Sequence, residues 1–203
     1  MQIESRYEFQ IKILLIGDSG VGKTNFIFQF TEGKFSPLHV TTVGFDFKTK
    51  IVKLPKSKKN VQLQIYDTAG QERYMALNKS LFQKVQGIII MYDITNRASY
   101  ENLSIWFNAV NETISNKTII LVGNKLDLAN DKRIITEEEG QKIANENHIL
   151  FFEASSCTGE NVDNIFKLIG EKIYKRLMDE KSETSNTKIN LNRKSNKEKK
   201  NCC

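Results

Sequence analysis

The segment GDSGVGKT at residues 17–24 constrains the fold more than any other part of this chain. Gly17 and Gly22 bracket four residues and are followed by Lys23 and Thr24, which is the G-x-x-x-x-G-K-[ST] spacing of a phosphate-binding loop. Glycines let backbone N–H groups approach an anion, the start of the next helix adds its positive dipole end, and the lysine supplies an ammonium for the outer phosphates. The Thr24 hydroxyl is suited to binding Mg²⁺. A glycine-rich turn with a solvated lysine is the alternative, but the apolar run before the loop and the helical pattern after it favour phosphate binding.

Apolar runs alternate with amphipathic segments along the chain, which predicts an α/β fold with helices on both faces of the sheet. Strands are predicted over six segments: 9–17, 45–54, 61–66, 87–93, 118–124 and 149–155. The second and third alternate in polarity and are joined by the turn PKSKKN, so they form a hairpin that adds one antiparallel edge strand to an otherwise parallel six-stranded sheet.

Helices are predicted over four segments: 24–33, 99–112, 136–147 and 161–178. Trp106 is expected in the core, on the inward face of the second of these. Thr136 and Glu139 have the spacing of a capping box and open the third. The periodic pattern ends after Met178.

Positive charge is concentrated at the C-terminus. The chain has a formal net charge of +6, and residues 188–203 carry six Lys or Arg against one Glu, which leaves only +1 for residues 1–187. A basic nucleic-acid-binding stripe on the domain is therefore not indicated. We expect an N-terminal extension over residues 1–8, one domain over 9–178, and a disordered basic tail over 179–203 that is too polar to bury a core.

The chain has no sequence feature of a membrane-spanning or exported protein. No apolar stretch reaches the ~18 residues that a span requires, and the N-terminus lacks the layout of a signal peptide. The cysteines Cys157, Cys202 and Cys203 form neither a disulfide framework nor a zinc pattern. We therefore expect the protein in the cytosol.

The segment DTAGQE at residues 67–72 directly follows the third predicted strand. At such a position Asp67 is suited to holding a magnesium-bound water, the Gly70 N–H to contacting a terminal phosphate, and Gln71 to orienting a water for in-line attack. An ordinary turn is the alternative. The place of the segment beside the phosphate loop favours the functional interpretation.

The segment NKLD at residues 124–127 ends the fifth predicted strand, at the carboxyl edge where open α/β sheets bind ligands. The Asp127 carboxylate can accept two hydrogen bonds from adjacent N–H donors, which guanine has and adenine lacks. Asn124 can fasten this loop to the phosphate loop, and the aliphatic stem of Lys125 can lie on the base. The motif therefore predicts GTP rather than ATP.

In order and spacing, GDSGVGKT, TTVGFDF, DTAGQERY, GNKLD and EASS resemble the motifs of small GTPases of the Ras superfamily, and within it the Rab branch of vesicle-traffic regulators, over residues 9–178. The resemblance implies a P-loop NTPase small G domain that cycles between GTP and GDP with Mg²⁺. By the same resemblance, Thr42 coordinates magnesium and senses the terminal phosphate, Phe35 covers the guanine edge, and Ser155 with the backbone of Ser156 completes the base pocket.

The site predicted from the motifs and the resemblance has three overlapping groups of residues. The catalytic residues are Gln71, Lys23, Thr42 and Gly70. The metal ligands are Thr24, Thr42 and Asp67. The nucleotide-binding residues are Ser19, Gly20, Val21, Gly22, Lys23, Thr24, Asn25, Phe35, Thr42, Gly70, Asn124, Lys125, Asp127, Ser155, Ser156 and Cys157.

Several positions depart from the family pattern. Tyr66 replaces the usual tryptophan before DTAG, which alters the aromatic surface that effectors and exchange factors read. The loop Ser155-Ser156-Cys157 replaces S-A-K, so the lysine stem that packs over the base is missing. This change favours a weaker affinity for the base.

The chain ends in KEKKNCC, which is not a C-a-a-X box because Lys200 stands four residues from the end. In Rab proteins a terminal CC is the substrate for double geranylgeranylation, and the resemblance implies this modification at Cys202 and Cys203. Two lipid chains anchor stably, and the basic run adds attraction to an anionic leaflet. As a coil, residues 179–203 would span about 25 to 30 Å.

The resemblance also implies partners and a location. The partners are an exchange factor, a GTPase-activating protein, effectors, a GDP-dissociation inhibitor and a prenylation escort. The core is expected to be monomeric, and the anchored protein is expected on the cytoplasmic face of intracellular membranes. Because no arginine is evident that acts in cis, intrinsic GTP hydrolysis is expected to be slow.

Two other functions are compatible with a phosphate loop. A kinase for small molecules would need a second substrate pocket and usually an arginine-bearing lid, for which this compact chain has few residues to spare. A nucleotide-bound scaffold that no longer cycles is the second possibility, and the presence of Gln71, Thr42 and Lys23 argues against it.

Overall fold

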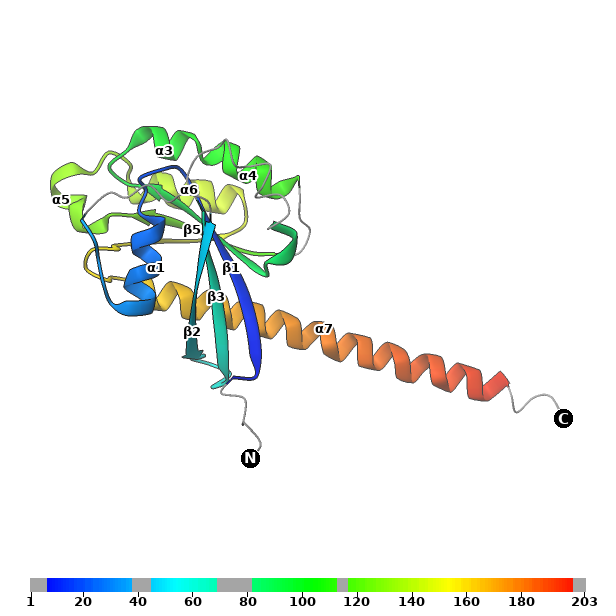
Figure 1. Cartoon of the computed structure of the whole chain (residues 1–203). Coiled ribbons are helices and arrows are strands. Elements are labelled where there is room, and N and C mark those ends of the chain that lie inside the picture. The colour runs from blue at the N-terminus through cyan, green and yellow to red at the C-terminus, as the bar shows by residue number, and fades with distance from the viewer. Residues whose placement is uncertain (1–6, 38–44, 69–81, 113–116, 199–203) are drawn as a thin grey trace, which may run out of the picture.

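The computed structural model describes residues 7–37, 45–68, 82–112 and 117–198, which form one mixed sheet flanked by helices (Figure 1). The strands are β1 (Phe9–Ile16), β2 (Phe45–Lys53), β3 (Asn60–Thr68), β4 (Gly87–Asp93), β5 (Thr118–Asn124) and β6 (Leu150–Ala154). The helices are α1 (Lys23–Glu32), α3 (Arg97–Glu101), α4 (Leu103–Asn111), the 3-10 turn η2 (Leu126–Leu128), α5 (Ala129–Lys132), α6 (Glu137–Glu146) and α7 (Val162–Glu198).

The sheet has the order β2-β3-β1-β4-β5-β6. β1 lies in the middle and pairs in parallel with both β3 and β4. Only β2 is antiparallel, pairing with β3 from Phe45 opposite Thr68 to Lys53 opposite Asn60. The predicted six-stranded sheet with one antiparallel edge strand is confirmed. Because the other strands are parallel, the loops after β1, β3, β4, β5 and β6 emerge at the same edge, where the predicted motifs lie.

Each face of the sheet is covered by its own helices. In β1, alternate side chains Ile11, Ile13 and Leu15 pack into a core shared with α1 and α7. The intervening Leu14 and Ile16 pack on the other face, in a core shared with α4 and α6. A strand buried on both faces is apolar throughout, which is why the run before the phosphate loop shows no polar alternation at its end.

The helical segment predicted over residues 99–112 is divided into α3 and α4, and the two meet at Asn102. Trp106 on α4 is 1% exposed, which confirms its prediction as a core residue. The capping box of α6 is also confirmed. The Glu139 N–H donates to Thr136 Oγ1 over 3.2 Å, and the Thr136 N–H donates to Glu139 Oε2 over 2.8 Å.

The last helix is longer than the sequence pattern predicted. We expected it to end at Met178 and to be followed by a disordered tail, but α7 continues to Glu198 and projects away from the sheet in Figure 1. The chain contains neither Gly nor Pro after Gly170, so nothing breaks the backbone hydrogen bonding of the helix. Arg176 Nε lies 3.8 Å from Glu180 Oε1 one turn later, an ion pair along the helix. Polarity excluded a core there, but it did not exclude a helix.

The helical form changes the expected geometry of this segment. At 1.5 Å per residue, residues 179–198 form a rod about 30 Å long. The division of the chain into an extension, a domain and a tail stays a prediction. Among the residues that the structure describes, no helix combines the length and the apolarity needed to cross a bilayer.

Candidate functional site

The phosphate-binding loop connects β1 to α1 and passes close to the neighbouring strands. Gly17 has a φ of 138°, and a Cβ there would lie 2.1 Å from the backbone oxygen of Met91. Gly22 has a φ of 99°, and a Cβ there would lie 2.4 Å from Asn124 Nδ2. Both positions therefore need glycine for two reasons, the left-handed backbone and the close approach. Gly20 also has a positive φ, of 81°.

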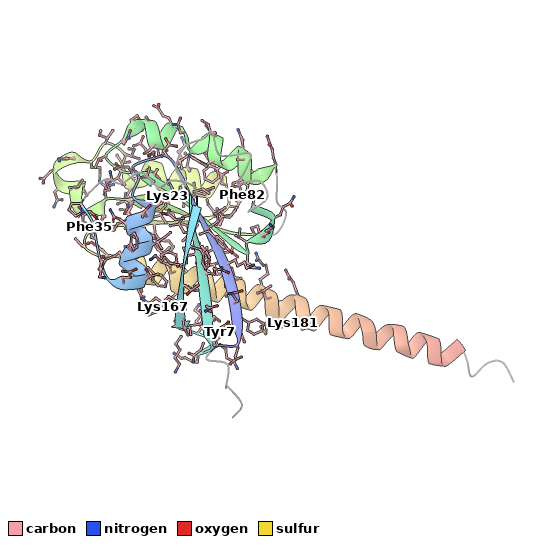
Figure 2. All side chains as sticks on the ribbon, viewed as in Figure 1. Tyr7, Lys23, Phe35, Phe82, Lys167 and Lys181 are labelled. Carbon is pink, nitrogen blue, oxygen red and sulfur yellow. The ribbon has the colours of Figure 1, made fainter. Side chains whose placement is uncertain are left out.

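Lys23 lies at the first position of α1 and is only 5% exposed (Figure 2). Its Nζ donates to the backbone oxygens of Gly17 and Asp18, each over 2.8 Å. Burial lowers the pKa of Lys23 to about 8, and the charges of Asp67 and Asp18 partly oppose this effect. A buried ammonium held by loop carbonyls at a helix start is suited to a polyphosphate, whose charge would stabilise it.

Thr24 and Asp67 form the candidate metal site. Thr24 Oγ1 in the first turn of α1 donates to Asp67 Oδ2 near the end of β3, over 2.6 Å. The two side chains therefore share one place, although 43 residues separate them. A hydroxyl and a carboxylate are hard oxygen donors, the kind Mg²⁺ prefers. Over the described ranges no cluster of three or more His, Cys, Asp or Glu side chains is suited to a metal. Of the three predicted ligands, the structure brings Thr24 and Asp67 together.

Asn124 joins the phosphate loop to the loop after β6, and this contact confirms one expectation. Its Nδ2 donates to the backbone oxygen of Val21 over 2.8 Å. Its Oδ1 accepts from the Ser156 N–H over 3.0 Å and from Ser156 Oγ over 3.1 Å. The resemblance assigned the Ser156 backbone to the base pocket, and in the structure its N–H group donates to Asn124.

Asp127 and Ser155 form the candidate base-recognition pair. Ser155 is fully buried, and its Oγ donates to Asp127 Oδ1 over 2.5 Å. The same Oγ accepts from the N–H groups of Cys157 and Thr158 over 3.1 and 3.0 Å. The exposed Asp127 carboxylate is therefore oriented by a rigid hydroxyl. Cys157 is an exposed free thiol, so it contributes its backbone rather than a long stem to this loop.

Lys125 has a left-handed backbone with a φ of 72°. Its Nζ lies 2.6 Å from Asp93 Oδ2, while Asp93 Oδ1 accepts from the N–H and the hydroxyl of Thr95. This ion pair holds the lysine between β4 and β5. Asp93 was not predicted as a site residue. Its signal in the sequence was an aspartate that ends a buried parallel strand at the ligand-binding edge.

Asp18, the second residue of the phosphate loop, is held by two side chains that the sequence motifs do not include. Asn102 Nδ2 donates to Asp18 Oδ2 over 2.7 Å, and Trp106 Nε1 donates to Asp18 Oδ1 over 2.8 Å. Trp106 was predicted only as a core residue. No local pattern relates residues 84 and 88 positions apart, so this contact follows from the fold alone.

The segment after α1 is fastened by Asn25. Its Nδ2 donates to the Ser36 backbone oxygen over 2.8 Å, and its Oδ1 accepts from the Ser36 N–H over 3.1 Å. The adjacent Phe35 lies in the segment after α1 (Figure 2), and its side chain is 42% exposed. Ser19 is also exposed.

Several predicted site residues lie outside the described part of the chain. They are Thr42, Gly70, Gln71, Cys202 and Cys203. Their roles stay predictions. The residues that the structure does describe come together at one edge of the sheet, where Lys23, Thr24 and Asp67 form the candidate phosphate and metal end and Asn124, Asp127 and Ser155 form the candidate base end.

Comparison with known proteins gives consistent matches over most of the chain. The model of the Ras family matches residues 12–175. GTP-binding protein ypt2 of Schizosaccharomyces pombe is 39% identical over 198 residues, which cover 97% of this chain and 98% of that protein. Ras-related protein SEC4 of Saccharomyces cerevisiae is 40% identical over 203 residues, covering 97% and 93% of the two chains. Ras-related protein Rab-10 of Caenorhabditis elegans is 39% identical over 185 residues, covering 91% and 90%.

Proposed function

The chain belongs to the Rab branch of the Ras family of small GTPases, and from this membership and the geometry of the site we propose that it is a membrane-anchored GTP/GDP switch in intracellular vesicle traffic. The resemblance seen in its motifs is confirmed by the family match. The contact of Asn124 with Val21 carries the proposal, because it joins the candidate phosphate and base ends into one site. The chain is a GTPase by family membership.

Selection of guanine is assigned to Asp127. Its carboxylate would accept hydrogen bonds from the ring N–H and the exocyclic amine of guanine, while Ser155 holds the side chain in place. Adenine lacks this pair of donors. Sites built on such hydrogen bonds discriminate by as much as roughly 10⁴- to 10⁵-fold.

Thr24 and Asp67 fit Mg²⁺ in the chemistry of their donors. We assign Thr24 and Thr42 as ligands and Asp67 as the holder of a metal-bound water. Bound Mg²⁺ would neutralise charge on the phosphate oxygens. Lys23 would add its ammonium to the same phosphates, since its Nζ is fixed by the loop carbonyls.

Hydrolysis in this proposal depends on positioning and electrostatics. Gln71 orients the attacking water, and Lys23 with the loop N–H groups stabilises negative charge that grows on the transferred phosphoryl group. An activating protein would supply a further positive charge, which is worth roughly 10³- to 10⁵-fold in rate.

The switch itself is assigned to Thr42 and Gly70, which would be drawn to the terminal phosphate of GTP and released after hydrolysis. Effectors would then read the two ordered segments and the strands between them. Phe47, which is 49% exposed, and Tyr66 lie in contact between those segments, with ring centroids 5.9 Å apart. This aromatic pair supports an effector surface in which Tyr66 takes the place of tryptophan.

Nucleotide binding and hydrolysis test the proposal directly. We expect purified full-length chain to bind GTP and GDP in preference to ATP by at least a hundredfold.

Gln71→Leu should bind GTP normally but hydrolyse it at least tenfold more slowly in single-turnover assays, because only the water-orienting amide is lost. Equal affinity for ATP would refute the guanine site, and an undiminished rate in the variant would remove Gln71 from its role.

The terminal cysteines are assigned to double geranylgeranylation, which would anchor the protein to the cytoplasmic face of an intracellular membrane. The support is the CC ending, the basic residues before it and the family. Partners in this scheme are a prenylation escort, a GDP-dissociation inhibitor, an exchange factor, an activating protein and effectors.

Removal of the anchor should release the protein. We expect the double variant Cys202→Ser/Cys203→Ser to shift from the membrane fraction to the soluble fraction of cells, because it can carry neither lipid chain and stable anchoring requires two such signals. Cys157→Ser is the matched control and should stay on the membrane. A double variant that kept the membrane distribution of the wild type would contradict the assignment.

A further inference from the structure

We propose that Asn102 and Trp106 are positioning residues for nucleotide binding, because they hold the Asp18 carboxylate and with it the phosphate loop. The proposal rests on the proposed function, since the loop is taken to bind nucleotide phosphates. It adds Asn102, at the junction of α3 and α4, and Trp106 on α4 to the set of residues that controls how long the nucleotide stays bound, although both are far from the loop in sequence.

The contact engages both oxygens of one carboxylate. Asp18 Oδ2 accepts from Asn102 Nδ2 over 2.7 Å, and Asp18 Oδ1 accepts from Trp106 Nε1 over 2.8 Å. Both hydrogen bonds are charge-assisted and short, a class roughly twice as strong as neutral pairs. Because the donors are four residues apart, they lie on the same face of the helical segment and meet the carboxylate together.

Asn102 is directed to Asp18 at the expense of a local role. It is the N-cap residue of α4, a position where an asparagine side chain ordinarily accepts a hydrogen bond from a backbone N–H of the helix. The Asn102 side chain makes no such capping bond. Asn96 at the start of α3 does cap its helix by accepting from the Ala98 N–H. The two asparagines therefore differ, and only Asn102 reaches out of its helix to the phosphate loop.

Trp106 connects the loop to a rigid core. The residue is 1% exposed and packs with Leu103, Phe107 and Val110 among the side chains between the sheet and α4. A buried indole N–H generally has a hydrogen-bond partner, and here the partner is a charged side chain of the functional loop. The loop is thus tied to a ring that has little freedom to move.

The position of Asp18 explains why it needs restraint. Its backbone oxygen accepts from Lys23 Nζ, and its charge acts on the same ammonium. A carboxylate that was free to rotate would compete with phosphates for Lys23 and would repel them. Asn102 and Trp106 hold that charge aside at the start of the loop, while Asn124 holds the loop further along at Val21.

Dissociation of a fluorescent GDP analogue from the full-length protein with Mg²⁺ tests the proposal. We expect Asn102→Ala and Trp106→Phe each to raise the dissociation rate about tenfold, which corresponds to about 1.4 kcal/mol. Asn108→Ala is the matched control, because Asn108 is exposed on the same helix, and its rate should stay within twofold of the wild type. A wild-type rate in both Asn102→Ala and Trp106→Phe would overturn the proposal.

A second background separates positioning from general stability. In an Asp18→Ala chain the carboxylate is gone, so adding Asn102→Ala should change the dissociation rate by less than twofold. A role confined to helix stability would instead give the same acceleration in both backgrounds, and that result would overturn the proposal. A wild-type chain that failed to bind the GDP analogue at all would overturn the proposed function as well.

The lone tryptophan supplies an independent readout. Trp106 is the only tryptophan of the chain, so its fluorescence reports one site. We expect its emission to change when EDTA removes Mg²⁺ and releases GDP from the wild type, and the change to fall by at least half in Asp18→Ala. An emission unaffected by nucleotide release in the wild type would contradict a link between the indole and the loop.

Discussion

Asp127→Asn should lower the affinity for GDP and GTP by roughly 10²- to 10⁴-fold, because two charge-assisted hydrogen bonds of about 1.5 to 3 kcal/mol each are lost or weakened. The Ser155 hydroxyl donates to Asp127 Oδ1, so it would keep the oxygen of the new amide on its side. The amide nitrogen would then face the exocyclic amine of guanine, donor against donor. Equilibrium titration with a fluorescent guanine nucleotide measures the loss.

The same reasoning predicts which base the variant should prefer. Xanthine has a carbonyl oxygen where guanine has the exocyclic amine, so it can accept from the asparagine N–H group. We expect Asp127→Asn to bind xanthosine diphosphate more tightly than GDP. Asp131→Asn, the same chemical change at a nearby exposed aspartate on α5, should leave the affinity for GDP within twofold of the wild type. If Asp127→Asn bound GDP like the wild type, Asp127 would not be the base-recognition residue.

Lys23→Met should lower the affinity for GDP and GTP by about 10²- to 10⁴-fold, because the variant loses the charge-assisted hydrogen bonds that the ammonium would make to the phosphates. Methionine keeps the length and apolar volume of the lysine stem, so the change isolates the charge. Lys34→Met is the matched control, because the Lys34 side chain is 75% exposed and pairs with Glu32 at the surface. Nucleotide affinities of the two variants at the same Mg²⁺ concentration give the comparison, and an unchanged affinity in Lys23→Met would exclude the lysine from the phosphate site.

Lys23 should also leave a signature in the pH dependence of stability. Its pKa is about 8 in the folded protein against 10.5 for an ordinary lysine. Between these values the unfolded chain binds more protons, so the free energy of unfolding of the nucleotide-free protein should rise with pH, by at most about 3 kcal/mol from this group. The difference between wild type and Lys23→Met in chemical denaturation at pH 7.5 and 10 measures the effect. A difference that stayed constant with pH would contradict the lowered pKa.

Much of the fold was predictable because its signals are local. The apolar strands, the hairpin formed by β2 and β3, and the capping box of Thr136 and Glu139 each depend on residues a few positions apart. The phosphate loop and the NKLD segment were likewise identified by short spacings, and the Asn124 contact followed once both were placed at one sheet edge.

Other features were not predictable, because they depend on distant residues or on a balance of weak preferences. Asp18, Asn102 and Trp106 meet only after the α3 and α4 segment has packed beside the phosphate loop. Asp93 became a site residue only when the pairing of β4 with β5 placed it opposite Asn124 and within reach of the neighbouring Lys125. The extension of α7 past Met178 was not predicted, because a polar composition is typical of a coil, whereas a segment without Gly or Pro can continue a helix.

The length of α7 has a mechanical consequence for an anchored protein. A coil at this position would let the domain tumble above a bilayer at many heights and tilts. One continuous helix starts at Val162, inside the packed domain, and runs to Glu198. Because the helix is rigidly joined to the domain, the height of the domain above the bilayer and its tilt would change together. In the proposed anchored state, the orientation of the domain surface would then be set by the angle between α7 and the bilayer, and a glycine hinge inserted into α7 would free that surface to turn.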